Sequence, residues 1–235
     1  MPDPDPELLA STPVPLDAQQ FNRDAVLPHG LSTGHIQSAM EDFLAFIGLI
    51  NTQLRTKQLI RLESMLMPAN FSSIVGEFMG STIPKYCPTL VKNRYHNGHP
   101  DLIPMGLFDG DAVQHATEGV EIKGSRYLRG WQGHNAEDTW LMVFVFDSNR
   151  PVDLEKNSAR PFRFVQVLGA ALTEDDWAFA GRSPTSRRTI TATVTPSGYA
   201  KMAANWIYGR PGQINAAPEV AGPEPVDESD LAAEQ

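Results

Sequence analysis

Hydrophobic residues recur at helical spacing in the first half of the chain and in short, strand-like runs in the second half. Apolar positions three and four residues apart predict helices over residues 34–50, 59–66 and 70–80. Asn70 is a suitable N-cap for the third helix and Gly80 a suitable stop. Glu77 lies at the border of the apolar stripe of this helix, so its carboxylate could lean over the surface that the stripe contacts.

Strand-like runs follow over residues 100–103, 118–124, 139–147 and 162–170. The run TWLMVFVFD is apolar and aromatic enough to predict a central strand buried on both faces. After it, TEDDWAFAG begins like a helix capped by Thr173, RRTITATVT alternates like a half-exposed strand, and PSGYAKMAANWIYG predicts a closing helix. This order favours an α/β protein with a central mixed sheet flanked by helices, with further helices at the N-terminal end.

Composition divides the chain into three parts. Residues 1–28 hold six prolines without clear periodicity, which predicts a flexible N-terminal arm. Residues 29–210 show no marked shift in composition and no internal repeat, which predicts a single domain. Residues 211–235 are rich in Pro, Ala and Glu, which predicts a disordered acidic tail.

The net charge of −9 is concentrated at the two ends. Residues 1–24 carry five acids and one base, and residues 211–235 carry six acids and no base. The remainder holds 17 acids and 18 bases. Because the body is nearly neutral, the overall charge neither supports nor excludes DNA as a partner.

The chain shows no sign of a membrane or secreted protein. Its longest apolar run, Trp140 to Phe146, is too short to span a bilayer, and the start MPDPDPELL lacks the features of a secretion signal. The single cysteine, Cys87, excludes an internal disulfide. We expect a cytoplasmic location and no membrane partner.

The segment GVEIKGS, residues 119–125, places an acid and a lysine on one face of a predicted strand. Glu121 and Lys123 point to that face, while Val120 and Ile122 point to the other. Asp101 opens the preceding strand, so a hairpin would bring its carboxylate to Glu121. Two close carboxylates repel unless a cation lies between them, and Mg²⁺ prefers oxygen ligands. The pattern predicts a Mg²⁺ site in which Lys123 assists an attacking water.

Pro100-Asp101 followed by Glu121-Ile122-Lys123 resembles the signature of the PD-(D/E)XK nuclease superfamily, whose fold is that of many type II restriction endonucleases. The resemblance covers roughly residues 70–170 and implies a restriction-endonuclease-like core. It implies that Asp101 and Glu121 bind the metal together with the backbone carbonyl of Ile122. It also implies a supporting acid from an earlier helix, for which Glu77 is the first candidate, followed by Glu63 and Glu41.

The resemblance implies hydrolysis of double-stranded DNA to a 5′-phosphate and a 3′-hydroxyl, in the role of a stand-alone type II restriction enzyme. Cutting both strands needs two sites, so we expect a homodimer. No P-loop and no G-x-G-x-x-G pattern occurs, which predicts no nucleotide cofactor. Basic and amide side chains near the predicted site are candidates for DNA contact: Arg126, Arg129, Gln132, His134, Asn135, Arg187 and Arg188.

Other interpretations stay open. A repair, phage or mobile-element nuclease with little sequence preference would share this core, and so would a DNA-binding protein that does not cleave. The histidines at 96, 99, 115 and 134 are compatible with a ββα-metal nuclease, but the hairpin spacing and the cysteine pairs of that fold are not evident. We expect His96 and His99 to be loop residues near the mouth of the site. A Ser-His-Asp hydrolase is disfavoured because no G-x-S-x-G elbow occurs.

Overall fold

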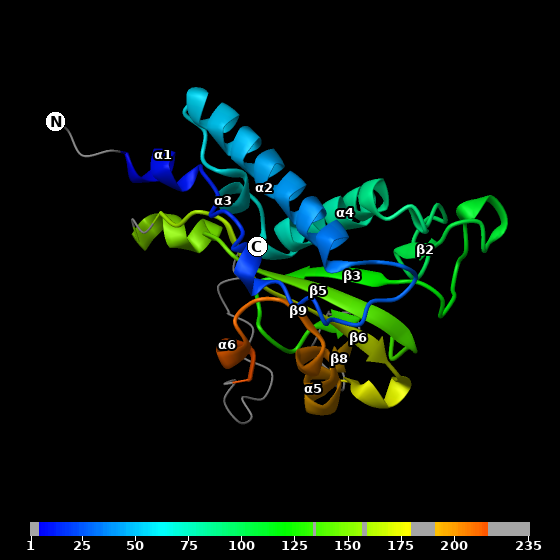
Figure 1. Ribbon diagram of the computed structural model, residues 1–235. Coiled ribbons are helices and arrows are strands. Elements are labelled where there is room, and N and C mark those ends of the chain that lie inside the picture. Colours follow the sequence, from blue (N-terminus) through cyan, green and yellow to red (C-terminus); the bar gives the residue numbers. More distant parts are fainter. Residues whose placement is uncertain (1–4, 134, 157–158, 180–190, 216–235) are drawn as a thin grey trace, which may run out of the picture.

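The computed structural model describes residues 5–133, 135–156, 159–179 and 191–215. Long helices lie on one side of a central sheet, and a short helix and a small second sheet lie on the other (Figure 1). The α-helices are α1 (Pro6–Ala10), α2 (Thr33–Thr56), α3 (Leu62–Met65), α4 (Pro68–Tyr86), α5 (Pro196–Ala204) and α6 (Pro211–Asn215). Short 3₁₀-helices are η1 (Ala18–Gln20), η2 (Asp109–Asp111), η3 (Pro151–Lys156) and η4 (Glu174–Asp176).

The central sheet is mixed and four-stranded. Its strands stand in the order β3 (Glu121–Ser125), β5 (Thr139–Asp147), β6 (Arg163–Leu172) and β9 (Trp206–Tyr208). β3 and β5 are parallel, and the other neighbours are antiparallel. A two-stranded sheet is formed by β1 (Leu90–Lys92) and β2 (Leu102–Pro104), and a three-stranded one by β4 (Gln132–Gly133), β8 (Ala192–Val194) and β7 (Trp177–Phe179). The expected mixed sheet with flanking helices is confirmed.

Strand β5 is the centre of the molecule, as its composition predicts. Met142, Phe144 and Phe146 pack into the core under α2 and α4, whereas Leu141 and Val143 pack into a second core on the opposite face. Every side chain from Leu141 to Phe146 is at most 1% exposed. A strand covered on both faces cannot tolerate an alternating polar pattern, which is why the run is continuously apolar.

Helix α4 lies directly against β3, which is the edge strand of the sheet. A Cβ atom added to Gly124 would stand 2.4 Å from the backbone oxygen of Ser72 on the helix, so only glycine allows this approach. Gly124 and Ile122 share the face that α4 covers. Glu121 and Lys123 therefore point to the other face, as the alternation of the segment predicts.

Residues 5–28 lie against the domain. Val14 N–H donates to the backbone oxygen of Phe162, and Asn22 N–H donates to that of Ile207. Phe21 also packs its ring on Tyr208, with centroids 4.7 Å apart. These contacts fasten the segment to the sheet. Of the predicted acidic tail, residues 216–235 lie outside the described residues, and the division into arm, domain and tail stays a prediction.

The helix predicted after Thr173 is wrong, and the predicted closing helix ends at Ala204, because Trp206–Tyr208 form strand β9. Thr173 does cap a turn, through a capping box with Asp176, but the turn ends after η4 and the chain continues as strand β7. Trp177 then pairs with Val194 of β8. The local capping signal was correct, yet pairing of the following aromatic segment with another strand overrides helical propensity. The helices predicted over 59–66 and 70–80 are respectively shorter and longer in the structure, as α3 and α4.

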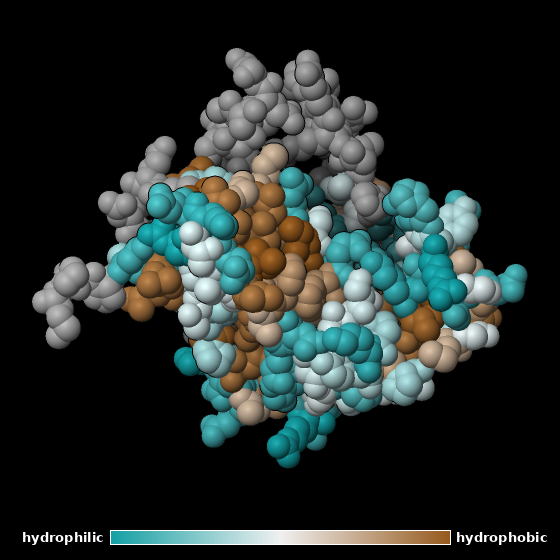
Figure 2. Space-filling view, turned by 90° about the horizontal axis from the view of Figure 1, so that it is seen from above, coloured by the Kyte–Doolittle hydropathy of each residue, from teal (hydrophilic) through white to brown (hydrophobic). Residues whose placement is uncertain are grey.

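The helical side of the molecule exposes apolar surface. Figure 2 shows a band of hydrophobic residues bordered by hydrophilic ones on the face seen from above. Exposed hydrophobic side chains of these helices include Leu49 on α2 and Met65 on α3. Among the described residues, no helix combines the length and the apolar character needed to cross a bilayer.

Candidate metal-binding site

Backbone pairing brings Asp101 to the edge of the central sheet. Leu102 and Val120 exchange two backbone hydrogen bonds, of 3.0 and 2.8 Å, so the start of β2 lies antiparallel to the approach of β3. This register sets Asp101 beside Ile122, whose N–H donates a 2.8 Å hydrogen bond to Oδ2 of Asp101. The N–H and C=O of one residue in an extended strand point to the same edge. The carbonyl oxygen of Ile122 is therefore directed to the side of the strand on which Asp101 lies.

Glu121 and Lys123 form an ion pair next to this hydrogen bond. Nζ of Lys123 lies 2.7 Å from Oε1 of Glu121, and the Glu121 side chain is only 15% exposed. Because Ile122 separates the two along the strand, Asp101 is adjacent to both. The structure thus brings together Asp101, Glu121, Ile122 and Lys123, as the sequence predicts.

The two carboxylates differ sharply in their preference for a proton. Burial, and then the negative charge of Glu121, raise the pKa of Asp101 to about 7, against the lowering effect of the Ile122 N–H. Burial also disfavours ionised Glu121, but the hydrogen bond from His99 and the charge of Lys123 outweigh it and lower its pKa to about 2. For Lys123, burial is outweighed by Glu121, and its pKa is raised. Glu121 and Lys123 are thus both charged at neutral pH, whereas Asp101 forms no ion pair with any of the described residues.

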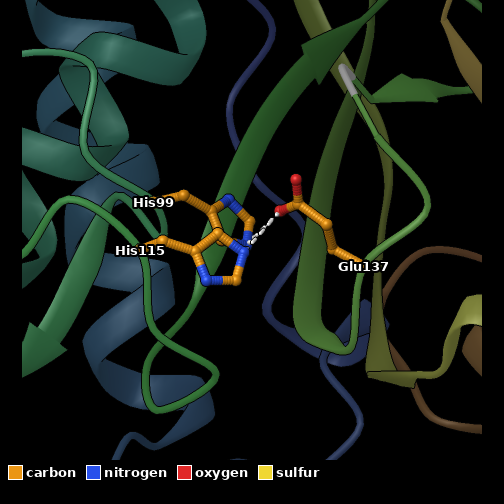
Figure 3. Close-up of side chains that lie close together, drawn as sticks. All are labelled: His99, His115 and Glu137. Atoms are coloured by element: carbon orange, nitrogen blue, oxygen red, sulfur yellow. Dashed lines mark ion pairs between the residues drawn. The ribbon is translucent and has the colours of Figure 1, made fainter.

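A second group of side chains, which was not predicted from the sequence, lies next to this site. Nδ1 of His99 lies 3.1 Å from Oε2 of Glu121, and its Nε2 lies 3.0 Å from Oε2 of Glu137. Nε2 of His115 lies 3.6 Å from the same Glu137 oxygen. Figure 3 shows the two imidazole rings side by side, with the carboxylate of Glu137 facing them. His99 is near the site as expected. Burial of the imidazole lowers the pKa of His99, but the hydrogen bond and the charge of Glu121 outweigh this effect and raise it above the usual value.

Glu137 was not predicted from the sequence, because its importance depends on a long-range strand pairing. It lies just before β5, and β5 runs parallel to β3 with Leu141 opposite Glu121. The start of β5 therefore falls at the same end of the sheet as Glu121. An acid directly before the central strand was the available signal, but it becomes meaningful only once the parallel pairing is known.

Glu77 takes a different position from Asp101 and Glu121. It lies on α4, the helix that covers the Ile122 face, and its Oε2 is 2.6 Å from Nζ of Lys92. Its side chain is 69% exposed. Its negative charge contributes to the raised pKa of Asp101, so it acts on the site electrostatically.

The two substitute acids are engaged elsewhere. Glu63 is fully buried and pairs with Arg61 and Asn51. Glu41 accepts a hydrogen bond from Gln37 on the surface of α2. The side-chain partners of both acids thus lie away from Asp101, so Glu77 remains the first candidate for a supporting acid.

The predicted DNA contacts separate into different environments. Arg126 turns inward: its guanidinium donates to the backbone oxygens of Ser148 and Asn149 and stacks over the rings of Phe71 and Phe146. Burial lowers its pKa to about 10. These contacts give the guanidinium a structural role within the fold, and DNA contact by Arg126 stays a prediction.

The other candidates lie nearer the surface. Arg129 stacks over the ring of Tyr199 at 4.6 Å, Gln132 is exposed on β4, and Nδ2 of Asn135 donates to Oε1 of Glu137 at 2.8 Å. Asn135 is thereby linked to the group around His99. His134, Arg187 and Arg188 lie outside the described residues.

Comparisons with protein-family models, with curated proteins and with solved structures find no match to this chain. The case for a function therefore depends on the residues of this chain alone.

Proposed function

We propose that this protein is a magnesium-dependent endodeoxyribonuclease with a restriction-endonuclease-like core, acting on double-stranded DNA as a type II restriction enzyme. The observation that carries the proposal is the hydrogen bond from Ile122 N–H to Asp101, which sets a partly desolvated carboxylate beside the Glu121–Lys123 pair. The order of these residues along the chain is that of the PD-(D/E)XK signature, and the bridge between Leu102 and Val120 brings them together at the β3 edge of the mixed sheet.

The donor set suits a hard cation. Asp101 and Glu121 offer carboxylate oxygens, and Ile122 offers a carbonyl oxygen directed to the same edge. Mg²⁺ takes such ligands and keeps several waters. The raised pKa of Asp101 supports the assignment, because a nearby divalent cation is what would keep both carboxylates ionised. When bound there, Mg²⁺ would polarise the scissile phosphate and make a water more acidic.

The protein's own groups have separate tasks. Lys123, kept protonated by Glu121, would donate to the attacking water or to the phosphate oxygens as negative charge develops. The water oxygen loses a proton to solvent and bonds to phosphorus, while the bond from phosphorus to the 3′-oxygen breaks. The 3′-oxygen takes up a proton from solvent, which leaves a 5′-phosphate and a 3′-hydroxyl. Glu77 supports the site by its charge from across the strand.

The partners follow from the reaction. Arg129, Gln132 and Asn135 are the described candidates for contact with DNA, beside the undescribed His134, Arg187 and Arg188. Cleavage of both strands calls for two copies of the site, and the exposed apolar side chains of the helical layer offer surface for a homodimer.

A second candidate function has its own support. Both carboxylate oxygens of Glu121 already have protein partners, Lys123 and His99. Such a network also suits a protein that keeps this fold to bind DNA without cleaving it. A nuclease with little sequence preference is a third form of the same proposal.

Plasmid digestion with Mg²⁺ tests the proposal. The wild-type chain should produce discrete fragments, and Asp101→Ala and Lys123→Ala should each lower the cleavage rate by at least about 10²-fold, as removal of a transition-state group does. Both variants should still bind DNA. Lys85→Ala is the matched control, because Lys85 pairs with Asp42 away from the site.

The outcomes separate the candidates. A smear in place of fragments would favour the nonspecific nuclease. DNA that is bound by the wild-type chain but left intact with Mg²⁺ would favour the non-catalytic protein and refute the nuclease.

A further inference from the structure

We infer that His99, His115 and Glu137 form a binding site for a transition-metal ion, of which Zn²⁺ is the best match, separate from the Asp101–Glu121 pair. This inference goes beyond the proposed nuclease activity and does not depend on it. It follows from the positions of three ligand atoms and from the hydrogen bonds of their other atoms.

The three side chains bring potential ligand atoms close together. One ligand atom from each of His99, His115 and Glu137 lies within 4.8 Å of the other two. The two nitrogen–oxygen distances are 3.0 and 3.6 Å. Bonds of about 2.0–2.1 Å to a tetrahedral Zn²⁺ place ligand atoms roughly 3.3 Å apart, so small side-chain movements would suffice.

The backbone holds the two histidines next to each other. His99 N–H donates to the oxygen of Gln114, and Ala116 N–H donates to the oxygen of His99, which forms a parallel bridge. Their rings stack with centroids 5.4 Å apart (Figure 3). Residues 16 positions apart in the chain thus present their rings as a pair.

Nε2 of His99 is the strongest evidence for an ion. This atom is buried and, among the described residues, has no hydrogen-bond partner, although Oε2 of Glu137 is only 3.0 Å away. The two atoms are close but not aligned for a hydrogen bond. A buried nitrogen without a partner is costly, and a shared metal ion would satisfy both atoms at once.

The outer atoms are arranged as in known metal sites. Metal-bound histidines usually donate their second N–H to a carboxylate, and Nδ1 of His99 lies 3.1 Å from Oε2 of Glu121. Glu137 is supported in the same way, since Asn135 donates to its other oxygen at 2.8 Å. These contacts fix the ring of His99 with Nε2 directed at the ion.

Ligand type selects the metal. Two imidazoles and one carboxylate suit Zn²⁺ and its neighbours, whereas Mg²⁺ prefers oxygen donors alone. Three protein ligands leave a fourth position open, which is the arrangement of zinc sites that also hold a water or a substrate. His115 is 59% exposed, so solvent and ligands can reach the ion.

Calorimetric titration of the metal-free full chain with Zn²⁺ tests this site. We expect one ion per chain, with binding abolished by His115→Ala and by Glu137→Gln. Glu121→Gln should weaken binding by about 10–100-fold, the usual effect of losing a group that orients a ligand. His96→Ala is the matched control, because His96 is an exposed histidine of the same segment and should leave binding unchanged.

Asp101→Asn distinguishes this inference from the proposed function. It should leave Zn²⁺ binding intact while it removes Mg²⁺-dependent cleavage. Loss of Zn²⁺ binding in Asp101→Asn, or its persistence in folded His115→Ala and Glu137→Gln, would place the ion elsewhere and overturn the inference. Circular dichroism confirms folding, and anomalous scattering at the zinc edge from a crystal should give a peak between His99 and Glu137.

Discussion

The backbone N–H of Ile122 donates a 2.8 Å hydrogen bond to a carboxylate oxygen of Asp101, 21 positions earlier in the chain. This bond joins the two halves of the candidate site, since Glu121 and Lys123 flank Ile122 on the strand. The acid that it holds is buried next to a second negative charge. The arrangement therefore has an energetic cost, and it is maintained by the packing of α4 against β3.

Asp101→Asn should stabilise the metal-free protein at neutral pH. The pKa of Asp101 is raised to about 7 from an ordinary value of 3.8. The unfolded chain therefore releases this proton at lower pH than the folded chain, so the stability of the wild-type fold falls as the pH rises from about 4 to about 7 and stays lowered above that. Each pKa unit corresponds to about 1.4 kcal/mol, so we expect a gain on the order of 2–4 kcal/mol at pH 8 that disappears toward pH 4.

Denaturant unfolding at several pH values measures this gain. Asparagine keeps an oxygen that can accept from Ile122, so the local geometry is preserved. Mg²⁺ should stabilise the wild-type chain at pH 8 but not the variant. Equal stability of the two proteins at pH 8 would contradict the electrostatic description of Asp101.

Glu77→Gln should have a smaller effect on cleavage than any change at Asp101. Glu77 is largely exposed, pairs with Lys92 and acts on Asp101 only through its charge. We expect the cleavage rate to fall by less than about tenfold, equivalent to 1.4 kcal/mol. Single-turnover rates of Glu77→Gln and Asp101→Asn make the comparison. Equal losses in the two variants would instead make Glu77 a direct metal ligand.

Gly124→Ala should destabilise the fold, whereas Gly76→Ala should not. A Cβ at Gly124 would stand 2.4 Å from the backbone oxygen of Ser72, which cannot move without shifting α4. Overpacking of this kind costs about 1–3 kcal/mol. Gly76 faces the same contact from the helix, but there a Cβ would meet its nearest atom, Gly124 N, at 3.5 Å.

The second variant is thus a matched control within one interface. Alanine is favoured over glycine inside a helix by about 0.5–1 kcal/mol, so Gly76→Ala should be neutral or stabilising. Thermal unfolding measures both changes. A stable Gly124→Ala protein would show that α4 does not lie as close to β3 as described.

Arg126→Met should lower stability and leave DNA affinity unchanged. The variant keeps the stem that packs near Phe71 but removes the hydrogen bonds to Ser148 and Asn149, at a cost of about 1–3 kcal/mol. Arg163→Met is the control, because the exposed pair of Arg163 with Asp147 is worth at most about 1 kcal/mol. Urea unfolding and a fluorescence titration with duplex DNA separate the two effects. Weaker DNA binding by folded Arg126→Met would instead make Arg126 a DNA contact.

Much of the fold follows from local patterns in the sequence. The continuous apolar run at 139–147 predicts a strand buried on both faces, and β5 has that position. The alternation in 119–125 correctly assigns Glu121 and Lys123 to one face and Ile122 to the other. Such patterns are reliable because side-chain period and burial are both local properties of the backbone.

Features that depend on long-range pairing could not be predicted from the sequence. The helix expected after Thr173 failed because Trp177 pairs with a strand residue 17 positions later. Glu137 was missed because only the parallel pairing of β5 with β3 brings it near Glu121. The inward turn of Arg126 was also hidden, since its partners Ser148 and Asn149 follow a different strand. None of these relationships leaves a trace in the residues next to it.

The position of β3 at the edge of the sheet makes the chemistry sensitive to strand alignment. A displacement of β3 by one residue against β5 would turn Ile122 to the face that Glu121 and Lys123 now occupy. It would also bury Glu121 and Lys123 beneath α4. Misaligned molecules would be both unstable and inert. Catalytic or metal-binding activity would then come only from those molecules in which β3 is paired with β5 in the correct register.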